Sequence, residues 1–162
     1  MVIILGFRLK KLDKKICAGI VLVVLVVAVV GCYYYFLQPM RTARIMIGGV
    51  ILSVELAETV SEQVKGLSGR NYLAPDHGML FVFDHQDYWG FWMTDMQFPL
   101  DIIWFNANRN VVFIETNLQP CTPNSCPIYI PTSVSMYVLE VNAGFVAAHG
   151  ITIGTTFSYI SY

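Results

Sequence analysis

Residues 100–105 read LDIIWF, a run in which every side chain except that of Asp101 is apolar. A polar stretch, Asn106 to Asn110, follows it, and a second apolar run then extends from Val111 to Asn117. Two short apolar runs joined by a turn-forming stretch are typical of a β-hairpin. Because the first run is apolar on both faces, we expect its strand to be covered on both sides, as in a sandwich or barrel core.

The same pattern continues outward from this hairpin. Residues 45–57 predict a hairpin that turns at Gly48-Gly49. Thr59 and Glu62, three residues apart, form a capping-box pattern for a short helix that ends near Gly66. Further strands are expected at 79–83, 88–93, 137–142 and 155–159, with one helical turn within 144–149. The sequence therefore predicts a mainly β fold, a β-sandwich or jelly-roll-like barrel with one or two short helices.

A different kind of segment precedes this region. Residues 16–37 contain no charged side chain, and as a helix these 22 residues would be about 33 Å long, enough to cross a membrane. Up to residue 40 the chain has five basic residues against one acidic residue, a net charge of +4. Beyond residue 40 it has five basic and ten acidic residues, a net charge of −5. The positive-inside rule then predicts a cytoplasmic N-terminus.

These observations predict a single-pass protein of the cell membrane. Its parts are a basic cytoplasmic tail (1–15), a transmembrane signal-anchor helix (16–37), a linker (38–43) and an extracytoplasmic β-rich domain (44–162). Two alternatives stay open, a cleaved secretory signal and a lipoprotein signal in which Cys32 would be lipidated. All three place the domain on the same side of the membrane.

Cys121 and Cys126 flank the turn-forming sequence Thr-Pro-Asn-Ser in the predicted external domain. An oxidising compartment permits a disulfide, and the turn can bring the two cysteines together. Free thiols and a metal site are the alternatives, but a metal site lacks a second pair of ligands at useful spacing. We expect the disulfide and no metal or other cofactor.

Two acids, Asp101 and Glu140, each interrupt an apolar strand. A buried carboxylate is costly unless it is paired or hydrogen-bonded, and Arg70 is one of only five basic residues beyond residue 40. The sequence thus predicts a cluster with Arg70 within ion-pair reach of Asp101 or Glu140. One interpretation is a structural network. The other is a ligand-binding or catalytic site, because two carboxyl groups can divide the acid and base roles.

Trp92 belongs to a dense aromatic band between residues 89 and 105. Most of this band is expected in the core, but members that face outward would form a stacking platform for a glycan or peptide. The net charge of −5 repels phosphate and disfavours nucleic acid as a partner.

Four blocks of sequence come in an order that resembles the "domain of unknown function 192" family of bacteria and archaea. They are residues 62–70 (EQVKGLSGR), 78–83 (GMLFVF), 91–105 (from FWM to PLDIIWF) and 138–144 (VLEVNAG). The resemblance covers about residues 44–160 and implies a small β-rich domain, often behind a signal or anchor segment, with no assigned reaction. Similar proteins usually have Met where Ser68 stands and Lys where Thr94 stands.

Two functions follow as hypotheses. The first is a membrane-anchored external module that binds a small molecule, glycan, peptide or partner protein through Arg70, Asp101, Glu140 and Trp92. The alternative is a hydrolase that uses Asp101 and Glu140 as a carboxylate pair. If both carboxyl groups open into one pocket, the hydrolase gains support; if they are sealed against other groups, binding does.

Overall fold

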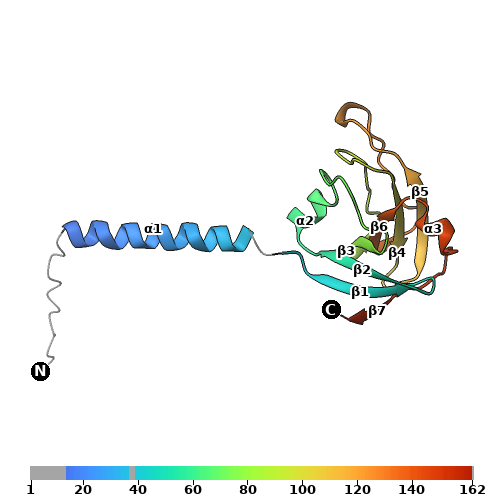
Figure 1. Cartoon of the computed structure of the whole chain (residues 1–162), viewed down its shortest axis with the longest axis horizontal. Coiled ribbons are helices and arrows are strands. Elements are labelled where there is room, and N and C mark those ends of the chain that lie inside the picture. Colours follow the sequence, from blue (N-terminus) through green and yellow to red (C-terminus); the bar gives the residue numbers. More distant parts are fainter. Residues whose placement is uncertain (1–13, 37–38, 162) are drawn as a thin grey trace, which may run out of the picture. The chain divides into compact units, whose positions relative to one another are not determined.

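The computed structural model describes residues 14–36 and 39–161, and the chain divides into two compact units between Pro39 and Met40. The first unit contains the helix α1 (Lys14–Phe36), and the second contains every strand (Figure 1). Residues 1–13 of the predicted basic tail lie outside the described residues, as do Leu37 and Gln38 at the predicted junction of span and linker.

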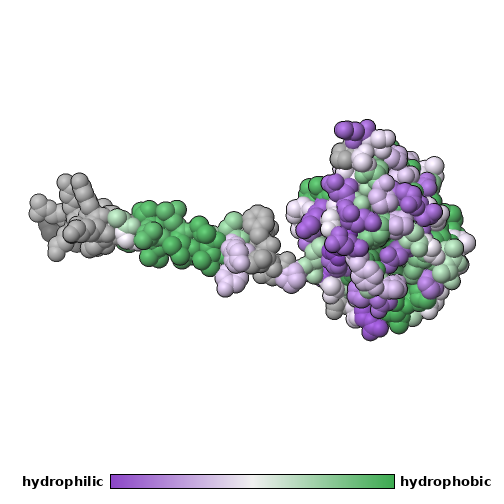
Figure 2. Space-filling model, turned by 45° about the horizontal axis from the view of Figure 1, so that its top comes forward, coloured by the Kyte–Doolittle hydropathy of each residue, from purple (hydrophilic) through white to green (hydrophobic). Residues whose placement is uncertain are grey.

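The described side chains of α1, residues 18–34, are almost all apolar or aromatic, and on the face in view Figure 2 shows a green, hydrophobic stretch along much of the helix, with paler lilac atoms near its C-terminal end. No helix in the described part of the chain reaches the length and apolar character needed to cross a membrane. The transmembrane helix predicted over residues 16–37 is therefore not confirmed and stays a prediction.

The second unit is built on one sheet of seven strands in the order β5-β4-β6-β3-β2-β1-β7. Its strands are β1 (Thr42–Ile47), β2 (Val50–Ala57), β3 (His77–Asp87), β4 (Leu100–Phe105), β5 (Val111–Leu118), β6 (Ser135–Asn142) and β7 (Ser158–Ser161). Its helices are α2 (Val60–Lys65), η1 (Pro123–Ser125) and α3 (Phe145–Ala148). All neighbouring strands pair antiparallel except β2 and β3, which are parallel.

Three local predictions are confirmed. Gly48 and Gly49 form the tight turn between β1 and β2, and both have positive φ, which a two-residue hairpin of this kind requires. Thr59 and Glu62 form a complete capping box at the start of α2, and Gly66 is the C-cap at its end, as predicted. The hairpin between β4 and β5 turns through residues 106–110 as expected.

The predicted β-sandwich or jelly-roll-like barrel is not found, because all seven strands belong to one sheet and that sheet does not close into a barrel. β4 is buried along its whole length and β6 over most of its length, whereas β3 is buried mainly between Gly78 and Phe83 and ends exposed. Each face of the sheet carries its own hydrophobic cluster. On one face, apolar side chains from β1, β2, β4 and β6 pack in one cluster with residues of the chain after β6. The two edges of the sheet approach each other there, because Asn110, just before β5, forms a bridge with Thr156, before β7. Residues 88–93, predicted as a strand, form a loop with one isolated bridge from Phe91 to Tyr129.

The parallel pairing of β2 and β3 determines the path of the chain between these two strands. Parallel strands cannot be joined by a tight turn, so the chain must cross over a face of the sheet between them. Residues 58–76 make this crossover and carry α2, which lies at one end of the domain in Figure 1. A pocket lies where this crossover meets the sheet.

Candidate functional site

The pocket has a volume of about 240 Å³ and is lined by α2, the crossover, β3, the loop after it, and one residue of β6. We call it the α2 pocket. Five aromatic side chains line it: Phe81, Phe83, Trp89, Phe91 and Trp92. Val60 and Val64 also line it, and they are 76% and 73% exposed, so apolar surface continues outward from the pocket. The capping-box pattern predicted this short helix but could not show that its valines face open space.

Glu140 is the acidic residue that lines this pocket. Its side chain is 5% exposed, and its Oε2 atom is buried with no hydrogen-bond partner among the described residues. Burial raises the pKa of Glu140 to about 8, although the positive charge of Arg70 acts in the opposite direction. The carboxyl group is therefore mostly protonated at neutral pH.

The strand register places Glu140 on an apolar face of the sheet. Glu140 pairs with Met79 of β3 and with Ile102 of β4, and both neighbours belong to the hydrophobic cluster on the same face. On the other side of β3, Glu55 of β2 also pairs with Met79, so Glu55 and Glu140 lie on the same face of the sheet, one strand apart. A side chain at Gly66 would lie only 3.7 Å from Glu140 Oε2, so the absence of a side chain there leaves space beside the carboxyl group.

Arg70 does not form the predicted ion pair with Asp101 or Glu140. Its guanidinium instead binds both carboxylate oxygens of Glu55, at 2.5 and 2.7 Å. This hydrogen-bonded contact lowers the pKa of Glu55 and raises that of Arg70. Sequence reasoning missed Glu55, because its place in an alternating strand is that of an ordinary solvent-facing residue.

Replacing Arg70 with methionine should lower the free energy of unfolding by about 1–2 kcal/mol, because it removes a half-buried bidentate pair. The same change at Arg109, for which the structure gives no ion pair within the described residues, should have a smaller effect. Chemical denaturation of both variants at pH 7 measures the difference. Equal losses would mean that the pair with Glu55 contributes nothing.

Asp101 lies away from the α2 pocket, on the other face of the sheet from Glu140. It pairs with Val141 across β4 and β6, whereas Glu140 pairs with Ile102, so the two acids point to opposite sides. The Asp101 side chain is fully buried, and its carboxylate accepts hydrogen bonds from the backbone N–H groups of Asn117 and Val146, each at 2.9 Å. The structure thus does not bring the proposed carboxylate pair together.

The aromatic wall is held by ring contacts and one hydrogen bond. Phe83 stacks on Trp89 with ring centroids 4.0 Å apart, and Trp104 donates a hydrogen bond to the Trp89 carbonyl. Trp89 Nε1 is buried and has no partner within the described residues. Trp92 is 55% exposed and lines the pocket, as a stacking platform requires.

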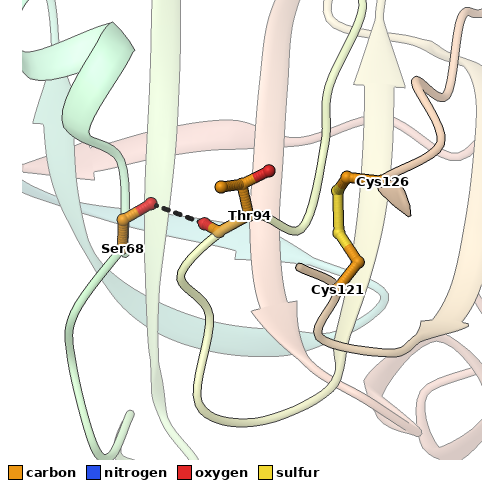
Figure 3. The surroundings of a disulfide bond; sticks show 4 residues. All are labelled: Ser68, Thr94, Cys121 and Cys126. Carbon is orange, nitrogen blue, oxygen red and sulfur yellow. Dashed lines mark hydrogen bonds between the residues drawn. A yellow bond between two sulfur atoms is a disulfide. The ribbon is translucent and has the colours of Figure 1, made fainter. Parts of the chain in front are cut away.

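The predicted disulfide between Cys121 and Cys126 is present, with Cα atoms 5.1 Å apart. Figure 3 shows it beside the loop that contains Thr94, whose carbonyl accepts a hydrogen bond of 3.1 Å from Ser68 Oγ. The Cys121 N–H donates to the Met93 carbonyl at 3.2 Å. The disulfide-closed loop, the loop of residues 91–96 and the pocket-lining Ser68 are therefore linked by hydrogen bonds.

No histidine lines the α2 pocket, although the ring of His85 contacts the wall residue Trp89, with centroids 5.0 Å apart. His77 and His85 each contact the preceding aspartate, at 2.8 and 2.6 Å. Among residues 14–36 and 39–161, no group of three His, Cys, Asp or Glu side chains is arranged to hold a metal ion.

One family model matches most of the chain, and two solved structures resemble it. The model of DUF192, described as "Uncharacterized ACR", matches residues 43–159. A crystal structure from Sinorhizobium meliloti 1021, of a protein described as a "putative transcription regulator", is 31% identical, with a TM-score of 0.69. The match covers 75% of this chain and 96% of that one. A protein of unknown function from Novosphingobium aromaticivorans DSM 12444 is 30% identical, with a TM-score of 0.69 and coverage of 75% and 88%. No curated protein matches the chain.

Proposed function

This chain belongs to the DUF192 family of uncharacterised proteins, and we propose that its β-rich domain is a binding module for a small ligand with an apolar, ring-sized body. The ligand occupies the α2 pocket. The observation that carries this proposal is Glu140, a buried carboxyl group with an unpartnered oxygen in a pocket walled by aromatic rings.

An unsatisfied buried polar atom costs about 1–3 kcal/mol, more for a charged group. Folded proteins therefore contain few of them, and each one calls for an explanation. Burying Glu140 without a partner weakens the domain, and a ligand group that bonds to its carboxyl would remove that cost. A titratable group with a strongly shifted pKa in a cleft is, for the same reason, a candidate functional residue.

The rim of the pocket supports the same function. Val60, Val64 and Trp92 leave large apolar side chains exposed, although burying them would be favourable. Small-molecule sites combine apolar and aromatic walls with a few polar groups that orient the ligand. Asp101, sealed by two backbone N–H groups on the other face, supports a structural role and leaves Glu140 without a second carboxylate for hydrolysis.

Binding of single-ring fragments tests this proposal. The full-length chain, held in lipid nanodiscs, is titrated with benzyl alcohol, benzylamine and benzoate while saturation-transfer NMR reports contact. At least one fragment should bind, and Trp92→Ala should weaken it several-fold. Tyr72→Ala, which removes an aromatic side chain that is 71% exposed and does not line the pocket, is the matched control. Binding by none of the fragments, or equal loss in both variants, would overturn the proposal.

We also propose that residues 16–37 anchor this module in the cell membrane, with the domain outside the cytoplasm. The support is the uncharged run of 22 residues and the excess of five basic residues over one acidic residue up to residue 40. The Cys121–Cys126 disulfide agrees with an oxidising compartment. The pocket would then meet ligands that reach the cell surface.

Protease added to intact cells, with the outer envelope made permeable where there is one, should digest residues 44–162 and leave the N-terminal tail intact. The positive-inside rule gives this orientation. Immunoblots with tags at each end record which part survives, and lysed cells serve as the control in which both ends are cut. A domain protected until lysis would contradict the orientation.

A further inference from the structure

We propose that the α2 pocket selects an organic cation, a primary amine on an aromatic or apolar body, and that Glu140 supplies the counter-charge. This inference rests on the proposed binding function and adds the chemical class of the ligand. The cation would lie beside Glu140 Oε2, where Gly66 leaves space, and its apolar body would lie against the aromatic walls.

The walls suit a cation as well as an apolar ring. Five aromatic side chains line the pocket, and the face of an aromatic ring attracts an ammonium group held over it. Such contacts are stronger in a site that excludes water. A neutral ligand could use the rings, but only a cation uses both the rings and an ionised carboxylate at the same place.

Glu140 is the acid that a ligand in the α2 pocket would meet, because the other charged groups nearby are paired, take part in the helix cap, are exposed to solvent, or lie farther away. Arg70 acts on it but is bound to Glu55, which lowers the net positive charge nearby. On α2, Glu62 is used by the capping box, and Lys65 lines the pocket but is exposed to solvent. The flanking neighbours on β3 and β4 are uncharged, and Glu115 stands beyond them on β5, paired with Ile102.

Binding must move a proton. Before binding, Glu140 is mostly a neutral acid, because burial raises its pKa to about 8. An ammonium ion stabilises the carboxylate, so the carboxyl O–H bond breaks, its proton leaves to solvent, and an ion pair remains. A neutral ligand would bind the protonated acid and release no proton. The two ligand classes therefore differ in how affinity depends on pH.

Calorimetric titration of the full-length chain with benzylamine and with benzyl alcohol, two probes of the same size, separates these cases. Benzylamine should bind at least tenfold more tightly than the alcohol at pH 8. Its affinity should rise roughly tenfold from pH 6 to pH 7, because the fraction of ionised Glu140 rises by that factor below its pKa. At pH 7, buffers of different ionisation enthalpy should report nearly one proton released.

Glu140→Gln should abolish the preference for the amine and its pH dependence, while Glu115→Gln should leave both unchanged. Tighter binding of benzyl alcohol, or an amine affinity that does not vary with pH, would overturn the cation inference and leave the binding function standing. Failure of both probes and of benzoate would overturn the proposed function itself.

Discussion

Replacing Glu140 with glutamine should abolish a strong pH dependence of folding stability. The native chain should lose about 5 kcal/mol of stability between pH 4 and pH 9, and the variant should not. The cause is the difference between the ordinary pKa of a glutamate, 4.5, and the value of about 8 in the folded domain. Each unit of difference corresponds to about 1.4 kcal/mol. Glutamine has nearly the same shape and does not titrate.

The direction follows from proton binding. Between these two pKa values the folded state holds a proton that the unfolded state has released, so stability falls as the pH rises. The contribution of the neutral acid is complete below about pH 4.5, and it is lost as the pH approaches 8. Above that pH, both states are ionised and the effect is constant.

Chemical denaturation at pH 4.5, 7 and 9 measures this dependence in both proteins. Relative to pH 4.5, the stability of the Glu140→Gln variant should rise against that of the native chain by about 3 kcal/mol at pH 7 and about 4 kcal/mol at pH 9. Glu115→Gln is the control, since Glu115 lies on β5 and is only half-buried. Parallel curves for the native chain and the Glu140 variant would show that Glu140 is not buried as a neutral acid.

Asp101→Asn is expected to destabilise the domain by about 3 kcal/mol. The carboxylate accepts from Asn117 N at the end of β5 and from Val146 N at the start of α3, and the side chain is fully buried. An amide has one oxygen, so it can satisfy one of these donors while its NH₂ group opposes the other. Hydrogen bonds to charged groups contribute about 1.5–3 kcal/mol, and an unsatisfied buried donor adds its own cost.

Thermal and chemical unfolding at pH 7 test this expectation, with Asp95→Asn as the matched control. Asp95 is exposed and has positive φ, a conformation that asparagine tolerates, so the control should change stability little. Binding of the fragment probes to folded Asp101→Asn should be unchanged, because Asp101 does not line the α2 pocket. A loss equal to that of the control would mean that the two hydrogen bonds are replaced by water.

The two acids also show how far the sequence could lead. Their positions in apolar strands correctly predicted that both are buried. Which face each one meets depends on the pairing of β4 with β6, where Asp101 stands opposite Val141. A slip of one residue would have put both carboxyl groups on the same side. Strand register between segments about forty residues apart cannot be read from either strand alone.

Local signals were reliable where the deciding contacts are local. The Gly48-Gly49 turn, the capping box and the disulfide all join residues a few positions apart, and all three are present. The partner of Arg70 was missed because Glu55 meets it only through the crossover between β2 and β3. A sandwich or barrel was predicted because several strands are apolar on both faces. That pattern shows that both faces are covered, but it does not identify the elements that cover them.

The crossover that joins the parallel strands has a consequence for how this family can diversify. The pocket walls come largely from the crossover and the loop of residues 91–96, whereas most of the core lies on the strands. Ser68 and Thr94, where similar proteins usually carry Met and Lys, stand in these two connecting segments and are joined there by a hydrogen bond. Under the proposed binding function, mutations in these segments would alter ligand preference while the scaffold keeps its stability, and relatives with the same sheet would recognise different molecules.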